Sequence, residues 1–470
     1  MLPINSVTVM ENSMQNKLIM LFGIAIICIT QICVADETKS SSSIAVVPTP
    51  TTDSNPEPAR RAMPAPLDSI FPSSEYLGPT IGVPNTDPIF PTTKFLWKAL
   101  PILQNNDIRI YGWVNPSYNY STSSQSNAPL SYDLVPNRPE LDQLVLRIER
   151  QPNTVQTDHA DWGFRLSNLY GIDYRYTTAQ GYFSHQLLQE NNMYGYDPVE
   201  AYIQLYIPGV AEGMLITVGR YISPPDIEAQ LAPENYLFTH SLMFTFDAYT
   251  QTGINAAIKL NNQWTVLLGV HAGDDVAPWA AGKHIPTALA MVRWVSKDNN
   301  DSLWGGIDSW NGGSFKGNHD NLQEFNLTWT HRFTEGFFTA TESYYMYQKN
   351  SPMGGTCIFG PARFFAGGGG CGMIIPGTSS EIGIVNYTEY KFAEKDFLSL
   401  RTDYLDDING ERSGFATAYA SFTAGVTHQF TDLIEMRPEI RYEFATRATP
   451  YNNGLRQNQF TVATDIIMRF

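Results

Sequence analysis

Charged and apolar side chains alternate along residues 433–444, which read LIEMRPEIRYEF. Because alternate side chains of a β-strand point to opposite faces, this pattern predicts a strand with one charged face and one apolar face. Pro438 lacks the amide hydrogen that a strand ladder uses, so we expect a bulge or a strand end near it. The charged positions are Glu435, Arg437, Glu439, Arg441 and Glu443.

Signals for catalysis or metal binding are weak. His240, Ser241 and Asp247 are near one another in the sequence, but adjacent residues of a strand point to opposite faces, which argues against a Ser–His pair. The chain contains neither G-x-S-x-G nor H-E-x-x-H. Its Asp-rich stretches are typical of turns, and Leu405 stands where a calcium loop would place its first ligand. We therefore expect no catalytic residue, no metal site and no cofactor.

The elements that must position the charged side chains repeat from Ile108 to Phe470. Segments of about ten residues alternate in polarity and are separated by clusters of Gly, Asn, Asp and Pro. Residues 143–150, QLVLRIER, are one example. Strands that cross lipid must form a closed sheet, because an open edge would leave backbone groups unpaired. The repeat predicts an all-β fold, a transmembrane antiparallel β-barrel of about 16 strands, within a range of roughly 14 to 18.

Alternation by itself does not distinguish a membrane barrel from a soluble sheet, which also has one apolar face. Charged residues make up 16 % of the chain, below the ~25 % of a typical soluble domain. Aromatic residues reach 13 %, and many stand at segment ends, where the interfacial girdles of a barrel would lie. These features favour a membrane barrel whose charged face lines an aqueous lumen. A large secreted β-protein is the alternative.

The N-terminal residues predict export. Lys17 precedes an apolar run over 18–32, and small residues follow at Cys33 and Ala35, as in a signal peptide over residues 1–35. The run is shorter than the ~20 residues of a membrane-spanning helix. Residues 36–105 are expected to form a disordered, Pro-rich periplasmic segment with a short helix near 95–103, which Pro101 would cap or break, and residues 106–470 the barrel.

Two cysteines remain after the signal peptide, Cys357 and Cys371, in a Gly-rich stretch between apparent strands. In an oxidising compartment they most simply form a disulfide, which the chain-entropy model values at about 3 kcal/mol. Two unpaired thiols are the alternative. The formal charge of −16 argues against nucleic acid as a partner.

Several stretches resemble the putative beta-barrel porin type two (OmpL-like) family of bacterial outer-membrane proteins. The resemblance implies a channel of undefined substrate in the bacterial outer membrane, and no site residue is carried over from the family. Barrels of this kind end in a strand with a terminal Phe that the barrel-assembly machinery reads, and Phe470 is similar to that signal. The stretches that carry the resemblance are 108–127, 136–150, 161–181, 194–236, 240–254 and 269–279.

The stretch 220–236, RYISPPDIEAQLAPENY, suggests how such a channel could be narrowed. It follows a strand and contains Asp226, Glu228 and Glu234, and Asp226 could cap a short helix over 226–232. One hypothesis is that it folds into the lumen and faces arginines of the wall, because fixed charges and pore diameter set solute preference. A surface loop or a periplasmic turn is the alternative. The arginines considered are Arg147, Arg165, Arg175 and Arg220.

The sequence thus predicts a barrel in outer-membrane lipid that passes small hydrophilic solutes or ions by passive diffusion. Whether it forms a homo-oligomer stays open. One alternative is an adhesive barrel with a plugged lumen, in which long loops such as 357–371 bind a surface. The other is a lipid-modifying enzyme at the barrel rim, which replacement of Ser241 would test.

Overall fold

The computed structural model describes residues 81–82, 90–130, 132–190, 192–224, 227–316, 320–353 and 373–470. They all belong to one compact unit of the chain, Pro56–Phe470. The expected signal peptide, most of the expected periplasmic segment, Asp226 and the cysteine pair Cys357 and Cys371 lie outside the described residues.

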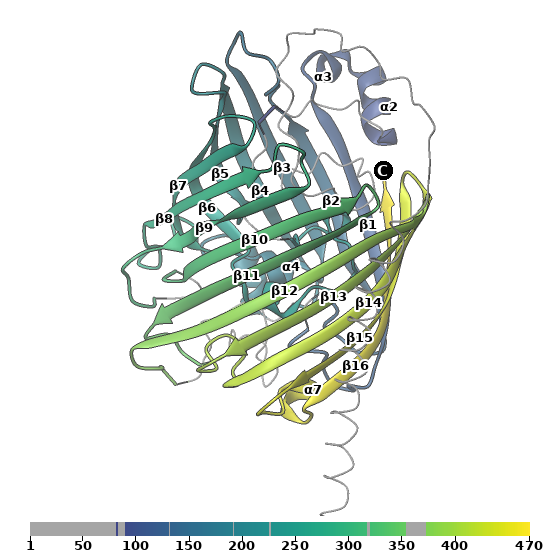
Figure 1. The fold of residues 1–470 in the computed structure, drawn as a ribbon, viewed down its shortest axis with the longest axis vertical. Helices are drawn as coiled ribbons and strands as arrows, with labels where there is room; N and C mark the ends of the chain where they lie inside the picture. Colours follow the sequence, from purple (N-terminus) through teal and green to yellow (C-terminus); the bar gives the residue numbers. More distant parts are fainter. Residues whose placement is uncertain are drawn as a thin grey trace, which may run out of the picture. The chain divides into compact units, whose positions relative to one another are not determined.

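The described strands form one closed antiparallel barrel, as the sequence predicts. Each strand pairs with its neighbours in chain order, and β16 pairs with β1 to close the sheet (Figure 1). The strands are β1 (Arg109–Ser121), β2 (Pro139–Arg150), β3 (Asp161–Gly171), β4 (Gly195–Ile207), β5 (Met214–Ile222), β6 (Thr250–Lys259), β7 (Trp264–Asp274), β8 (Thr287–Val295), β9 (Asp301–Trp310), β10 (Gln323–Thr334), β11 (Phe337–Lys349), β12 (Thr378–Ala393), β13 (Asp396–Asp407), β14 (Thr417–Thr431), β15 (Ile434–Ala445) and β16 (Asn458–Arg469).

The wall buries charged side chains and exposes apolar ones, which is the reverse of a soluble protein. On β2, Leu144 and Leu146 are 40 % and 41 % exposed, whereas Arg147 is 0 % exposed. The leucines therefore point outward and the arginine points into the barrel. A barrel in lipid requires this polarity, since its outer surface contacts hydrocarbon.

The two ends of the barrel have connections of different length. At one end, the strands are joined by tight turns such as 335–336, 394–395 and 432–433. At the other end, the connections include 122–138, 172–194 and 223–249. We call these the short-turn end and the long-loop end. Outer-membrane barrels usually have short periplasmic turns and longer extracellular loops.

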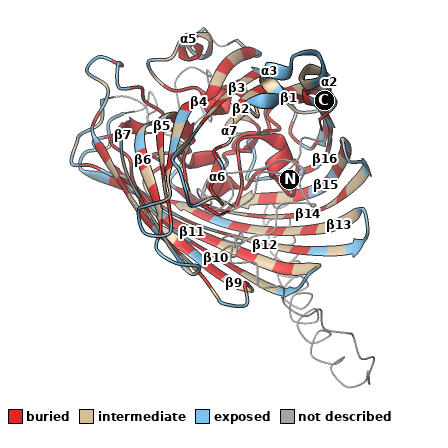
Figure 2. Cartoon of the chain, turned by 90° about the horizontal axis from the view of Figure 1, so that it is seen from above, coloured by how far each residue is buried: buried red, intermediate tan, exposed pale blue. Residues whose placement is uncertain are grey.

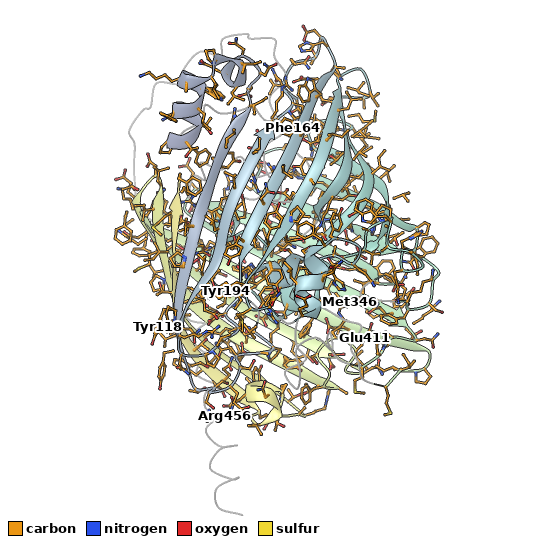
Figure 3. The ribbon with its side chains drawn as sticks, turned by 180° about the vertical axis from the view of Figure 1, so that it is seen from behind. Tyr118, Phe164, Tyr194, Met346, Glu411 and Arg456 are labelled. Atoms are coloured by element: carbon orange, nitrogen blue, oxygen red, sulfur yellow. The ribbon has the colours of Figure 1, made fainter. Side chains whose placement is uncertain are left out.

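Side chains cover the wall from one end to the other. Figure 3 shows Phe164 close to the short-turn end, Tyr118 further toward the long-loop end, and Arg456 among the connections beyond the strands.

Two helices precede the barrel at the short-turn end, α2 (Pro91–Ala99) and α3 (Pro101–Asn105). Pro101 stands at the start of α3, where its missing amide hydrogen is tolerated. The Oγ1 atom of Thr93 donates to Ile110 O at 2.6 Å, and Trp97 Nε1 donates to Ile108 O at 2.6 Å, so α2 is fastened to the beginning of β1. None of the described helices has the length and apolar character to cross a membrane.

The last residue takes part in closing the barrel. The amide of Phe470 donates to Gly112 O at 2.9 Å, and the amide of Gly112 donates to Phe470 O at 3.2 Å. A Cβ atom at position 112 would lie 2.8 Å from Phe470 Cζ, so glycine leaves room for the ring. The β1–β16 seam thus includes the chain's final residue.

Pro438 produces neither the bulge nor the strand end that we expected. It pairs with Thr464 of β16 within an uninterrupted β15. On the β14 side, the pairs Gly425–Glu439 and His428–Met436 keep one register across the proline. The strand therefore continues because its flanking residues hold it in place on both sides.

Candidate functional site

The connection between β5 and β6 enters the barrel, and its described residues 227–249 lie inside it. We call residues 227–249 the inward segment. Every residue of it is buried, and its helix α6 (Leu242–Phe246) lies within the ring of strands in Figure 2. Its hydrogen bonds reach β2 through Gln143 and β11 through Glu342, two strands far apart in the sheet.

The helix expected over 226–232 is absent from the described part of that stretch, which contains only a 3₁₀ turn, η1 (Ala232–Glu234). The side chain of Asn235 explains the difference. Its Nδ2 donates to Ala229 O at 2.8 Å and Leu231 O at 3.0 Å, and its Oδ1 accepts from Ala229 N at 2.8 Å. These bonds fix the backbone of Ala229 and Leu231 in a turn, and the amide of Ala232, which a helix would bond to Glu228 O, donates to Gln143 Oε1 at 3.0 Å.

Three arginines of the wall fasten the inward segment by its backbone. Arg437 Nη1 donates to Ala232 O and Asn235 O, both at 2.8 Å. Arg401 donates to Thr239 O, and Arg441 to the carbonyl of the next residue, His240. The three side chains come from β13 and β15, so these arginines act from one side of the barrel, in addition to the contact with β2.

Acidic side chains of the wall add further bonds from the same side. Glu439 of β15 accepts from Thr239 N at 3.1 Å and from Thr239 Oγ1. Glu342 of β11 accepts from Ile227 N at 2.8 Å. Buried polar groups are costly unless they are paired, so these contacts specify one position for the segment.

Glu228 of the inward segment meets a wall arginine, Arg401, which is not one of the four arginines that the constriction hypothesis named. Its carboxylate lies 3.4 Å from Arg401 Nη1 and accepts from Tyr387 OH at 2.8 Å and Ser241 N at 2.7 Å. Burial raises the pKa of the Glu228 carboxyl, and the charge of Arg401 opposes that shift. Glu234 is buried in η1, and Asp226 is not described.

Two glycines of the wall make room for the segment. A Cβ atom at Gly383 of β12 would lie 2.8 Å from Met243 Cγ, and one at Gly425 of β14 would lie 2.5 Å from Leu237 Cδ2. The apolar residues of the segment therefore pack onto bare backbone. Sequence reasoning did not identify either glycine.

A second charged group lies on the inner face of β2 to β4. Arg147 Nη2 is 3.0 Å from Glu200 Oε2, and Arg165 bridges Glu200 at 3.2 Å and Glu149 at 2.9 Å. Tyr111 OH donates to Glu149 Oε1 at 2.6 Å. The predicted wall residues Arg147 and Arg165 thus belong to one alternating network, separate from the arginines that hold the inward segment.

The other two predicted arginines serve the connection 172–194, which carries α4 (Tyr174–Thr177) and α5 (Ser184–Gln189). Arg220 Nη1 lies 3.0 Å from Asp197 Oδ1, and Nη2 donates to Thr177 O. Arg175 donates to Asn192 O. Both are buried, so they hold this connection in place.

The charged face of β15 points into the barrel, as the alternation predicted. Glu435 is 2.9 Å from Arg469 Nη2, and Glu443 accepts from Gln459 Nε2 at 3.3 Å and pairs with Arg441. Arg437 Nε also lies 3.0 Å from Asp465 Oδ1. These charges are 1–3 % exposed and meet protein groups.

His240 and Ser241 make hydrogen bonds to separate partners. Ser241 Oγ donates to Glu228 and accepts from Phe244 N at 3.0 Å, and His240 Nε2 lies 2.8 Å from Ala229 O. Burial lowers the pKa of His240 well below its usual value. In the described residues, no group of three or more His, Cys, Asp or Glu side chains is arranged to hold a metal ion.

Aromatic side chains from three long connections meet inside the barrel. The ring of Tyr132 lies 3.8 Å from that of His240 and 4.5 Å from that of Tyr176, measured between centroids. Phe244 lies 4.7 Å from His240 and 5.6 Å from Tyr249. Connections 122–138, 172–194 and 223–249 therefore share one apolar cluster within the lumen.

The sequence alone missed Arg401, Tyr387 and the two glycines. Like Arg437, Arg401 is a charged residue on the inward face of an alternating strand. Its neighbours Leu400 and Thr402 point outward. Applying the alternation to every strand would have identified it. Tyr387 carries no such signal, because tyrosine occurs on both faces of the wall.

Comparison with known proteins agrees with this architecture. The anion-selective porin from Comamonas acidovorans is similar with a TM-score of 0.51 and 11 % identity over 77 % of this chain and 99 % of that chain. The outer membrane channel DcaP of Acinetobacter baumannii has a TM-score of 0.46 and 10 % identity, over 77 % of this chain and 97 % of that chain. OmpT of Vibrio cholerae has a TM-score of 0.44 and 10 % identity, over 77 % of this chain and 97 % of that chain. At these identities, the first likeness supports the fold alone.

The search of curated proteins finds no match. The sequence model of one family, described as Putative beta-barrel porin-2, OmpL-like, matches residues 107–470, a range that contains all the strands of the barrel from β1 to β16. With its closed antiparallel sheet and its apolar outer wall, the chain belongs to this family of bacterial outer-membrane β-barrels.

Proposed function

We propose that this barrel passes small hydrophilic solutes or ions by passive diffusion, along a lumen narrowed by the inward segment. The proposal is supported above all by the attachment of that segment to β11, β13 and β15 through Glu342, Arg401 and Arg437. A segment fixed inside a closed barrel reduces its cross-section, and its charged contacts would lie beside the path that solutes take. Such charges set the preference of a channel for one sign of ion.

The experiment is ion selectivity in a planar bilayer, measured as reversal potential in a salt gradient. Replacing Glu228→Gln removes one acid of the constriction while keeping its shape. We expect the preference for cations over anions to fall. Glu212→Gln is the matched control, because Glu212 is 47 % exposed beside Lys259 at the short-turn end. An unchanged reversal potential in Glu228→Gln, with intact conductance, would count against the constriction.

A barrel with a plugged lumen, which binds through its long loops, is the second candidate. The observation that favours it is the aromatic cluster of Tyr132, Tyr176, His240 and Phe244, which joins three connections within the lumen. Liposomes containing the protein distinguish the two functions. A diffusion channel makes them swell in small sugars and more slowly in larger ones, whereas a plugged barrel gives no swelling at any sugar size.

The partners we expect are the surrounding lipid and the barrel-assembly machinery, which would read Phe470. The hydrogen bonds of Phe470 with Gly112 support a role of this residue in closing the seam.

A further inference from the structure

The motif Thr-His-x-Phe-Thr occurs twice on the outer wall, at residues 330–334 and 427–431. Each copy ends a strand, β10 or β14, at the short-turn end, and each is followed by a tight turn. Thr427 donates to Tyr236 O of the inward segment at 3.1 Å, but the His and Phe residues of both copies point outward, so the proposed channel does not explain them.

Both copies build the same local structure. His331 is the cross-strand partner of Asp301, and His428 is the partner of Asp396. In each pair the His Nδ1 lies 2.7 Å from the Asp Oδ1. The phenylalanine two residues later makes a T-shaped contact with the imidazole. The ring centroids are 4.5 Å apart with an interplanar angle of 79° for Phe333, and 4.6 Å apart with an angle of 82° for Phe430.

The two sites face outward and are accessible. The side chains of His331 and Asp301 are 29 % and 34 % exposed, and those of His428 and Asp396 are 39 % and 28 % exposed. On the first site an aromatic row continues along the wall, with Phe337 stacked on Phe333 at 4.8 Å. The row places the site in the aromatic girdle, at the level where lipid headgroups meet the protein.

The sites offer acceptors and no strong donor of their own. With Nδ1 turned toward Asp, a neutral imidazole presents its Nε2 lone pair outward. In the described structure, the Oδ2 atoms of Asp301 and Asp396 receive no hydrogen bond. Aromatic faces next to these acceptors attract a cation as well. A primary ammonium, which has three N–H donors, matches this set of groups.

A lysine lies beside the second site, where Lys395 Nζ is 3.3 Å from Phe430 O. A ligand with an ammonium at one end and a phosphate at the other would therefore find an opposite charge for each end at this site.

Apolar side chains continue from each site toward the middle of the wall. Leu303 and Leu327, further from the short-turn end than the first site, are 39 % and 52 % exposed. The outward residues Leu398 and Val426 occupy the corresponding place next to the second site and pair with each other. Acyl chains can lie along these surfaces. We propose that each His–Asp–Phe site binds the headgroup of an ethanolamine phospholipid, with its ammonium on the Asp–His pair and, at the second site, its phosphate near Lys395.

The test is native mass spectrometry of the full-length protein in a maltoside detergent with three lipids of identical acyl chains. Phosphatidylethanolamine has N–H donors, phosphatidylcholine has a cation without them, and phosphatidylglycerol has neither. We expect phosphatidylethanolamine to be retained about tenfold more strongly than phosphatidylcholine, which corresponds to about 1.4 kcal/mol. The double variant Asp301→Asn/Asp396→Asn keeps the shape of both sites and should lose this preference.

The matched control is Asp158→Asn. Asp158 pairs with His159 at 3.0 Å at the same end of the barrel, but both side chains are more than half exposed in a polar connection. This variant should retain the preference. Heat-modifiable migration on gels verifies that every variant is folded. Equal retention of the three lipids by the unmodified protein, or persistence of the preference in the double variant, would each overturn the proposal.

Discussion

The hydrogen bonds of Arg437 to the inward segment give the sharpest prediction about that segment. Arg437 donates to two carbonyls of the segment at 2.8 Å and pairs with Asp465 on the wall. Replacing arginine alone would leave Asp465 as a buried charge without its partner, which costs about 3–5 kcal/mol and would weaken the whole barrel. The double variant Arg437→Met/Asp465→Asn removes both charges. An asparagine at 465 can still accept from Asn115 Nδ2, now 2.8 Å away.

The double variant then differs mainly by the loss of the two carbonyl bonds. Hydrogen bonds to a charged group contribute about 1.5–3 kcal/mol each, and the two are not additive. Taking about 3 kcal/mol for the pair, the equilibrium between the fastened and the released segment shifts about 100-fold toward release.

Single-channel recording in a planar bilayer measures this shift. We expect the ratio of time spent away from the main current level to time spent at it to rise about 100-fold, and limited proteolysis to cut residues 227–249 faster. Lys259→Met is the control, because Lys259 is buried in the wall and its ion pair is with Glu212 of a short turn. If the double variant behaves like this control in both assays, Arg437 does not hold the segment and the reasoning fails.

Three further predictions concern packing, pH and assembly. Gly425→Val should displace Leu237, at an overpacking cost of about 1–3 kcal/mol, and reproduce the unstable current of the Arg437 variant; normal current would show that the wall tolerates a side chain there. Burial raises the pKa of Glu411, which lies in a connection at the long-loop end (Figure 3), from 4.5 to about 7. The folded state therefore holds this proton more tightly than the unfolded state, and the contribution to stability is lost as pH rises from 4.5 through 7. The thermal midpoint in detergent should be lower at pH 8 than at pH 5, and Glu411→Gln should reduce that difference; an equal difference in the variant would assign the effect to other groups. Deleting Phe470 removes two seam bonds to Gly112 and should slow folding into vesicles, followed by heat-modifiable migration, whereas an unchanged rate would limit its role to the folded state.

Much of the architecture could be read from the sequence because alternation is a local property of each strand. Which face of residues 143–150 or 433–444 meets lipid follows from side-chain polarity and the period of a β-strand, without knowledge of neighbouring strands. The closed sheet follows from the same pattern, since unpaired edges are excluded from hydrocarbon. The local breaker signal of Pro438 was misleading, because pairing on both sides of β15 overrides it.

The candidate site depended on tertiary structure. Ala232 and Arg437 are far apart in the sequence. No local pattern predicts that the carbonyl of Ala232 accepts a hydrogen bond from the side chain of Arg437. The helix expected over 226–232 was wrong for a similar reason, because Gln143 of the distant strand β2 accepts from the amide of Ala232 and Asn235 fixes the carbonyls of Ala229 and Leu231 in a turn. Arginines that the alternation placed in the lumen proved to contact protein groups, since a charge in a narrow barrel pairs with whatever segment the fold brings to it.

The sequence by itself thus determined the strands, their two faces and their closure, because these follow from periodicity and from the cost of unpaired backbone in lipid. Only the tertiary structure decided which connection enters the barrel, and which of the inward charges hold it there. Those contacts join residues from β2, β11, β13 and β15 to one segment, and closing such distant contacts depends on the whole sheet being formed.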